Sequence, residues 1–215
     1  MQTVLVKVGG SLLTLSDPGE RLRTMFAAIR ADGFLVVAGG GAATNVVREW
    51  DALYDLSEEV SHWLAIDSMS LTARLIANIL PNASLVSDRQ SAEECLRSGR
   101  IAVLDPRPII EELDREADRK LPVGWGCTSD SIAGWIATQL SVDAVVLAKS
   151  IDAPSEDRAP VDEGAALRWR PRAVDRCFDA VIAGRLPVHW CNLRDSPESV
   201  GVWKTARSDQ GSVSD

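Results

Sequence analysis

The sequence predicts a three-layer α/β fold, in which helices cover both faces of a central, mostly parallel β-sheet. Short apolar runs alternate with helical segments along the whole chain, and two of these runs, Thr3 to Val8 and Phe34 to Ala38, end in glycine. Such alternation is typical of βαβ units, whose crossovers connect parallel strands. A chain of 215 residues fits one domain, which we place at residues 1–207, followed by a disordered tail at 208–215.

The predicted strands are rich in β-branched and apolar residues and are bounded by glycine, proline or polar residues. In chain order they are residues 3–8, 34–38, 85–86, 101–104, 143–148 and 188–191. Helices are predicted where apolar residues recur at helical spacing, most clearly over residues 57–80, which Pro81 closes. The other helices are residues 17–31, capped by Ser16 or Asp17, and 42–50, 92–97, 129–140 and 173–183.

Other segments are predicted to be irregular. Pro106 and Pro108 mark either a loop or the start of a helix, and the charge run 114–120 is expected to be a solvated face. The polar stretch 155–164 is expected to be a mobile loop.

Composition narrows the classes of function. The formal net charge is −8, which argues against nucleic-acid binding through a broad basic face but allows a small anionic ligand in one cleft. The four cysteines form no C-x-x-C pair, so we expect free thiols and no metal site. We see no signal peptide and no apolar run long enough to span a bilayer. The protein is therefore expected to be soluble, cytoplasmic and independent of membranes.

Three predicted strands end in residues suited to phosphate binding. The first leads into Gly9-Gly10-Ser11, the second into Gly39-Gly40-Gly41, and the fifth into Lys149-Ser150. In open α/β sheets, ligands bind beyond the carboxyl ends of the strands. Glycines let backbone amides approach a phosphate closely, and serine adds a hydroxyl donor. The sequence therefore predicts an anion-binding edge of the sheet.

Lys7 lies inside an otherwise apolar strand. Burial of an ammonium group without a partner is costly, so a buried Lys7 requires an anion. The alternative is a lysine on an edge strand that faces water. The neighbouring Gly9-Gly10-Ser11 favours the buried interpretation.

Three further features have both structural and functional interpretations. Gly39–Gly41 precedes a helix, where amides and the helix dipole favour an anion, but a glycine triplet also makes a tight turn. Asp130 lies in the run Thr128-Ser129-Asp130-Ser131 that opens a helix. It has a structural interpretation as a residue favoured by the helix dipole, and a functional one as a carboxylate that orients the two lysines or helps to hold Mg²⁺; both can be true at once. Lys149 is either a polar strand exit or a second phosphate contact.

These motifs together resemble the amino acid kinase superfamily, which includes aspartate, acetylglutamate, carbamate and uridylate kinases. They occur in the family's order up to Lys149-Ser150-Ile151-Asp152, and a weaker likeness extends to about residue 200. The resemblance implies the amino acid kinase fold, ATP as phosphoryl donor, Mg²⁺ that arrives with ATP, and a small anionic acceptor. It also implies a homodimer or larger homo-oligomer, for which helix 57–80 offers apolar residues, although these equally suit the core of the monomer.

The resemblance implies three groups of functional residues. They are the catalytic residues Lys7 and Asp130; the nucleotide-binding residues Gly9, Gly10, Ser11, Lys149, Ser150 and Asp152; and the acceptor-binding residues Gly39, Gly40, Gly41, Arg48 and His62. Arg48 and His62 fall where uridylate kinases carry substrate contacts. Arg48 also fits an exposed helix residue, and His62 a histidine of the core or of a dimer face.

Residues 39–69 and Leu121–Trp125 are similar to the archaeal branch of the family that phosphorylates aminomethylfuran-methyl phosphate. A phosphate monoester acceptor is already ionised, so phosphoryl transfer to it requires positioning and charge neutralisation rather than a general base. The family's Val-Asp-Gly-Val is replaced by Ile151-Asp152-Ala153-Pro154. Two alternatives therefore stay open: a kinase of an amino-acid carboxylate or a nucleoside monophosphate, and a non-catalytic protein that binds nucleotides or oxyanions.

Overall fold

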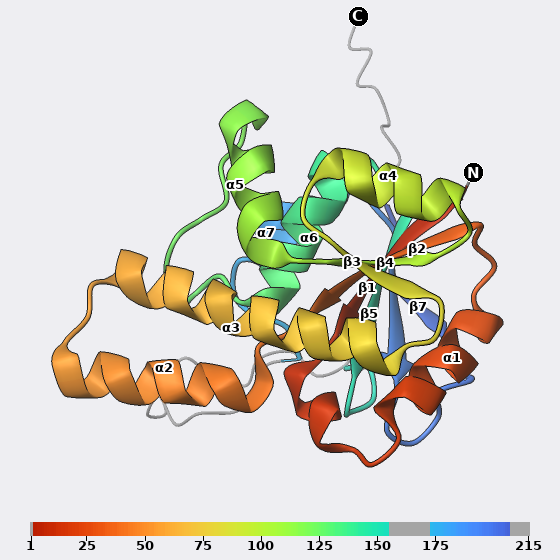
Figure 1. The fold of residues 1–215 in the computed structure, drawn as a ribbon, viewed down its shortest axis with the longest axis horizontal. Coiled ribbons are helices and arrows are strands. Elements are labelled where there is room, and N and C mark those ends of the chain that lie inside the picture. Colours follow the sequence, from red (N-terminus) through yellow and green to blue (C-terminus); the bar gives the residue numbers. More distant parts are fainter. Residues whose placement is uncertain (1, 155–172, 207–215) are drawn as a thin grey trace, which may run out of the picture.

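A β-sheet forms the centre of the protein (Figure 1). The structure, a computed structural model, describes residues 2–154 and 173–206, and within these ranges the sheet has seven strands in the order β3-β4-β2-β1-β5-β6-β7. All neighbouring pairs are parallel except β6 and β7. The strands are β1 (Thr3–Val8), β2 (Gly33–Ala38), β3 (Ala83–Val86), β4 (Ile101–Leu104), β5 (Ala144–Lys149), β6 (Val188–Asn192) and β7 (Gly201–Lys204).

Helices connect the strands and cover both faces of the sheet, which confirms the predicted α/β fold. Helix α2 lies alongside α3, and together they project to one side of the sheet (Figure 1). The helices are α1 (Pro18–Ala28), α2 (Gly41–Tyr54), α3 (Glu58–Ile79), α4 (Arg89–Arg97), α5 (Pro106–Glu116), α6 (Ser129–Gln139) and α7 (Phe178–Ile182), and a 3-10 turn, η1, spans Gly10–Thr14.

Side chains of the central strands alternate between two apolar cores, because successive strand residues point to opposite faces. Leu5 of β1 packs into the layer formed with α4, α5, α6 and α7. Its neighbours Val4 and Val6 pack into the layer formed with α1. Helix α3 contributes to both cores, with Ile66 in the first and Ile76 in the second. Most of the apolar periodicity of α3 is therefore used within the monomer.

Several predicted elements differ from those in the structure; helix 42–50, for example, extends to Tyr54 as α2, and helix 92–97 begins at Arg89 as α4. Helix α1 ends at Ala28 rather than near residue 31, because Ile29 adopts extended backbone that leads into β2. The helix predicted at 173–183 is only α7, since residues 173–177 run past the start of α6 instead. Strand β7 was not predicted; it is a short antiparallel edge strand. Pro106 begins helix α5, which decides between the two interpretations of that region.

Two predictions on the chain's organisation are not decided. The loop predicted at 155–164 and the tail at 208–215 lie outside the described residues. The boundary of a single domain at residue 207 therefore stays a prediction, although all described strands belong to one sheet.

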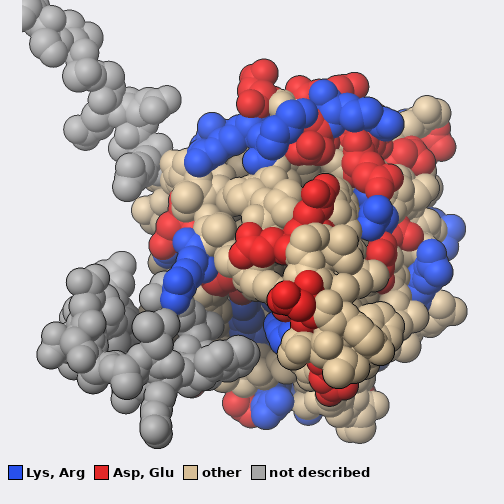
Figure 2. Space-filling model, turned by 90° about the vertical axis from the view of Figure 1, so that its left-hand side faces the viewer, with Lys and Arg blue, Asp and Glu red and all other residues tan. Residues whose placement is uncertain are grey.

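The surface mixes the two signs of charge. On the face shown in Figure 2, lysine and arginine side chains lie among acidic ones, and uncharged areas separate them. The four cysteines are free thiols, and burial raises the pKa of the Cys127 thiol to about 12. Of the helices in the described ranges, none is both long enough and apolar enough to cross a membrane.

Candidate active site

The ends of β1, β2 and β5 lie in register at one edge of the sheet. Val8 is opposite both Ala38 and Ala148. The Gly9 amide donates to the Ala148 carbonyl at 2.9 Å, and the Gly39 amide donates to the Val8 carbonyl at 2.8 Å. The two glycine loops and the end of β5, which carries Lys149, are therefore neighbours, as the sequence predicted.

The two glycine loops touch each other so closely that side chains do not fit between them. A Cβ atom on Gly10 would lie 2.3 Å from the Gly41 backbone nitrogen, and Gly41 has a φ of +57°. These distances leave no room for alanine at Gly10, and the left-handed backbone favours glycine at Gly41. The glycines thus have a structural role in joining the loops, in addition to any ligand that they bind.

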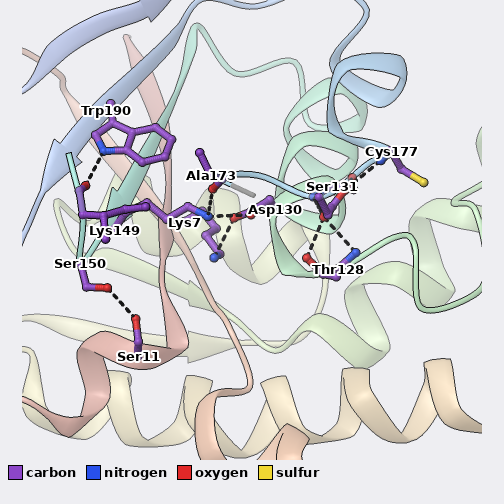
Figure 3. Close-up of polar contacts among 12 residues, drawn as sticks. Lys7, Ser11, Thr128, Asp130, Ser131, Lys149, Ser150, Ala173, Cys177 and Trp190 are labelled. Carbon is purple, nitrogen blue, oxygen red and sulfur yellow. Dashed lines mark hydrogen bonds and ion pairs between the residues drawn. The ribbon is translucent and has the colours of Figure 1, made fainter. Parts of the chain in front are cut away.

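A buried cluster of two lysines and one carboxylate lies at this edge (Figure 3). Asp130, in the first turn of α6, approaches the Lys7 ammonium with one oxygen at 2.7 Å and the Lys149 ammonium with the other at 2.6 Å. Lys149 also donates to the Ala173 carbonyl at 2.9 Å. Lys7 therefore meets the anion that its burial requires, and the three groups together carry one net positive charge.

The cluster perturbs the titration of its own members. Burial alone would raise the pKa of the Asp130 carboxyl, but the charges of Lys7 and Lys149 hold that pKa below its usual value. Burial and the charge of Lys7 lower the pKa of Lys149 to about 8, against the opposing pull of Asp130. A bound anion would favour the charged lysine, so the cluster is suited to receive one.

The hydroxyl groups of Ser11 and Ser150 lie 3.1 Å apart and bridge the first glycine loop and the end of β5 (Figure 3). Asp152 accepts a hydrogen bond at 2.8 Å from Asn192, at the end of β6. The Trp190 indole donates to the Ile151 carbonyl at 2.9 Å. The loop that departs from the family's pattern is thus attached to β6.

A cavity of about 250 Å³ opens beside the glycine loops. Its lining includes Gly10, Ser11, Gly39–Gly41, Thr44, Arg48, His62, Met69, Trp125 and Thr128. The acceptor-binding residues that the family resemblance implied therefore share one cavity, which also reaches the start of α6. Its size suits a small molecule rather than a polymer.

Arg48 and His62 each combine a structural and a potential functional role. Arg48 is exposed; its guanidinium donates to the Asn45 side chain at 2.8 Å and lies over the Trp125 ring, 5.4 Å from the centroid. His62 is buried, with 3% of its surface exposed, and burial lowers its pKa. A neutral imidazole is therefore favoured at neutral pH.

Sequence reasoning assigned no role to a second group of residues, Asp51, Ser61 and Trp125, although they lie in stretches that resemble the family. The Trp125 indole donates to Asp51 at 3.0 Å, and the Ser61 hydroxyl donates to the other oxygen of Asp51 at 2.6 Å. Asp51 thereby ties α2, α3 and the loop before α6 together at the cavity wall. Asp51 and Trp125 are far apart in the sequence, so no local spacing signals their contact.

Sequence reasoning also missed Asp175. Its carboxylate accepts hydrogen bonds from Thr128 and Ser131 at the start of α6. It lies 47 and 44 positions away from these residues along the chain. The segment that carries it resembled a helix, because its apolar spacing continues that of α7.

An open α/β sheet with glycine loops and buried lysines at the carboxyl ends of its strands is typical of proteins that bind phosphate. The family model described as "Amino acid kinase family" matches residues 2–153, and the chain belongs to this family. The [5-(aminomethyl)furan-3-yl]methyl phosphate kinase of Methanocaldococcus jannaschii is 30% identical over 150 residues, which are 69% of this chain and 66% of that protein. The uridylate kinase of Methanococcoides burtonii is 26% identical over 156 residues, 69% of this chain and 60% of that protein.

Solved structures share the fold. Uridylate kinase from Archaeoglobus fulgidus superposes with a TM-score of 0.62 over 94% of this chain and 98% of that one, at 17% identity. UMP kinase from Bacillus anthracis gives 0.58 over 90% and 88%, at 15% identity. These likenesses show the fold. The sequence matches to the two curated relatives span about two thirds of their length or less.

Proposed function

We propose that this protein is an ATP-dependent kinase that transfers a phosphoryl group to a small anionic acceptor. The observation that carries the proposal is the buried cluster in which Lys7 and Lys149 share the single carboxylate of Asp130. Phosphoryl transfer depends mainly on positioning and on neutralising negative charge. A cluster with one uncompensated positive charge, at the same edge of the sheet as the two glycine loops, supplies both.

The residues fit ATP phosphates at one side of the cluster. Gly10 offers a backbone amide, whereas the Gly9 amide already donates to Ala148, and Ser11 and Ser150 offer neighbouring hydroxyls. Lys149 supplies a positive charge, while Asp152, held by Asn192, shapes the loop on the nucleotide side. When bound, ATP supplies the phosphoryl group. Lys7 stabilises the negative charge on the phosphoryl group during transfer.

Mg²⁺ fits this site as a companion of ATP rather than as a resident ion. Both oxygens of Asp130 face lysine ammonium groups, so this carboxylate is not free to bind a cation. Mg²⁺ commonly keeps several waters and binds through substrate phosphates. We therefore infer that phosphate oxygens and water hold the ion here, and that Asp130 orients lysines instead.

The acceptor is proposed to be a phosphate monoester such as aminomethylfuran-methyl phosphate, which binds in the cavity beside Gly39–Gly41. The support is the 30% identity to a kinase of that compound. The amides of Gly40 and Gly41 suit the acceptor's phosphate, while the Gly39 amide already donates to Val8. Arg48 and His62 line the same cavity. His62 is not needed as a base, because an ionised acceptor has no proton to lose.

Two other functions have specific support. The similarity to a uridylate kinase favours a nucleoside monophosphate as acceptor, in the same cavity. The attachment of the Ile151–Pro154 loop to β6 through Trp190 and Asn192 favours a protein that binds nucleotides without turnover, because this loop departs from the family's pattern.

One experiment separates these possibilities. Purified protein is incubated with MgATP and each acceptor, and ADP release and the phosphorylated product are measured. We expect turnover with the furan phosphate and a loss of at least about 10²-fold in Lys7→Ala, because the removed charge acts on the transferred group. Full turnover in Lys7→Ala would contradict the mechanism. ATP binding without turnover for any acceptor would favour the binding protein.

We also propose that the protein self-associates through α2 and α3. Val46, Trp50, Leu53 and Tyr54 form a stripe at helical spacing on α2, and all four are exposed, as are Leu71 and Leu75 of α3. Apolar side chains gathered in this way favour contact with another protein surface. Light scattering should show a dimer or larger oligomer, and Leu53→Glu should weaken this association. A monomeric wild-type protein would exclude self-association.

A further inference from the structure

Asp175 caps the N-terminus of α6, although it is not part of that helix. The Thr128 side chain makes no capping bond within α6. Instead, one oxygen of Asp175 accepts hydrogen bonds from the Thr128 amide at 2.9 Å, the Thr128 hydroxyl at 2.7 Å and the Ser131 amide at 3.1 Å. The other oxygen accepts from the Ser131 hydroxyl and the Cys177 amide. The first amides of a helix lack partners within it, and a negative charge there is stabilised.

The residues that Asp175 binds enclose the centre of the lysine cluster. Asp130 lies between Thr128 and Ser131, so bonds to these two residues set the position of the turn from which its carboxylate projects. Two positions before Asp175, the Ala173 carbonyl accepts a hydrogen bond from Lys149 at 2.9 Å (Figure 3). Residues 173–177 therefore bind Lys149 directly and hold the residues on either side of its ion-pair partner Asp130.

Asp175 also acts on the charge of Lys149. The groups around this ammonium are Lys7 of β1, Asp130 of α6, the Trp190 ring of β6 and Asp175 itself. Burial and Lys7 lower the pKa of Lys149, whereas Asp130 and Asp175 raise it. Removal of the negative charge of Asp175 would thus leave Lys149 less often protonated near neutral pH.

We propose that Asp175 is a positioning residue for phosphoryl transfer, which orients the first turn of α6 so that Asp130 divides its oxygens between Lys7 and Lys149. The proposal rests on the proposed kinase function. Asp175 need not touch either substrate, because it acts through Asp130 and Lys149. The competing explanation is a helix cap that stabilises the fold and has no effect on the cluster.

The test compares Asp175→Asn and Asp175→Glu with the control Asp179→Asn, an exposed acidic residue four positions later. Two quantities are measured for folded protein. The first is kcat for the best acceptor between pH 6 and 10. The second is the pH dependence of acetylation of Lys149, followed by mass spectrometry on substrate-free protein, which reports the titration of this amine.

We expect Asp175→Asn to lower kcat by about 10²-fold, as a small misplacement of catalytic groups does. The midpoint of Lys149 acetylation should move to lower pH. Asp175→Glu should restore that midpoint but not kcat, because it keeps the charge and changes its position. Asp179→Asn should match the wild-type protein in both quantities.

Wild-type kcat and an unchanged Lys149 midpoint in Asp175→Asn would overturn the proposal and leave only a helix cap, whatever the loss of thermal stability. If wild-type protein turns over no acceptor, the kinase function fails. The Lys149 midpoint is measured without substrate, so a shift in Asp175→Asn would still show that Asp175 controls the ion pair.

Discussion

Replacing Asp130 by asparagine tests the lysine cluster most directly. Asp130 and Lys7 expose 7% and 5% of their side chains, and Lys149 exposes 13%. The substitution keeps the shape of the side chain but leaves two buried ammonium groups without their shared counter-charge. Breaking a buried ion pair in this way costs about 3–5 kcal/mol. Since folded domains are stable by about 5–15 kcal/mol, Asp130→Asn should lose a large part of the free energy of unfolding.

The assay is urea unfolding, followed by tryptophan fluorescence and circular dichroism at pH 7.5. The matched control is Asp67→Asn, which removes an ion pair to Arg107 whose side chains are 50% and 36% exposed. Exposed pairs contribute only about 0–1 kcal/mol, so the control should unfold close to the wild-type midpoint. Turnover should disappear in Asp130→Asn even under conditions where the protein remains folded.

A second substitution makes the test specific to charge. Lys149→Met added to Asp130→Asn removes one of the unpaired ammonium groups, so the double variant should recover part of the lost stability. A loss below about 1 kcal/mol in Asp130→Asn would refute the reasoning, since a buried and uncompensated pair of charges cannot be that cheap. The reasoning would also be refuted if the double variant were less stable than the summed losses in free energy of unfolding of Asp130→Asn and Lys149→Met predict.

Two further predictions concern Lys149 and the glycine loops. The pKa of Lys149 is lowered to about 8 in the folded protein, so the unfolded chain binds more protons above that pH, and this residue's contribution to stability should rise between about pH 8 and 10. Urea unfolding at pH 7.5 and 9.5 should therefore show that the free energy of unfolding of the wild-type protein rises relative to that of Lys149→Met. If the difference between the two proteins is the same at both pH values, the lowered pKa of Lys149 is contradicted. Gly10→Ala should destabilise the fold by about 1–3 kcal/mol or more, because its Cβ would lie 2.3 Å from a backbone nitrogen. Gly201→Ala is the control, because a Cβ atom at Gly201 would meet nothing within 4 Å. Equal melting temperatures for Gly10→Ala and Gly201→Ala would count against the contact between the glycine loops.

Local patterns predicted the parts of the site that lie on consecutive residues. The apolar run before Gly9 predicted β1, and the same signal predicted β2 and β5. Once these strands are parallel, their carboxyl ends must share one edge, so the glycine loops and Lys149 could be placed together. Lys7 was expected to meet an anion because it lies inside an apolar strand that leads into Gly9-Gly10-Ser11, and Asp130 was already a candidate.

Contacts between distant segments could not be predicted in this way. Asp51 meets Trp125, and Asp175 meets Thr128, only because the helices and loops of distant segments pack against one another in the folded chain. An isolated aspartate in a sequence gives no indication of its partner, since any exposed acidic residue looks the same. The short edge strand β7 was missed for a related reason: its four residues include glycine and lysine, and its pairing with β6 defines it.

The sequence by itself determined the family's fold, the edge of the sheet where ligands bind, and the residue types that meet there. Apolar periodicity and glycine positions are local properties, and they decide strands, helices and turns. Only the tertiary structure decided that Asp130 divides its two oxygens between Lys7 and Lys149, and that Asp175 holds the turn that makes this possible. Hydrogen bonds and ion pairs act over about 3 Å, so they depend on packing that brings distant residues together.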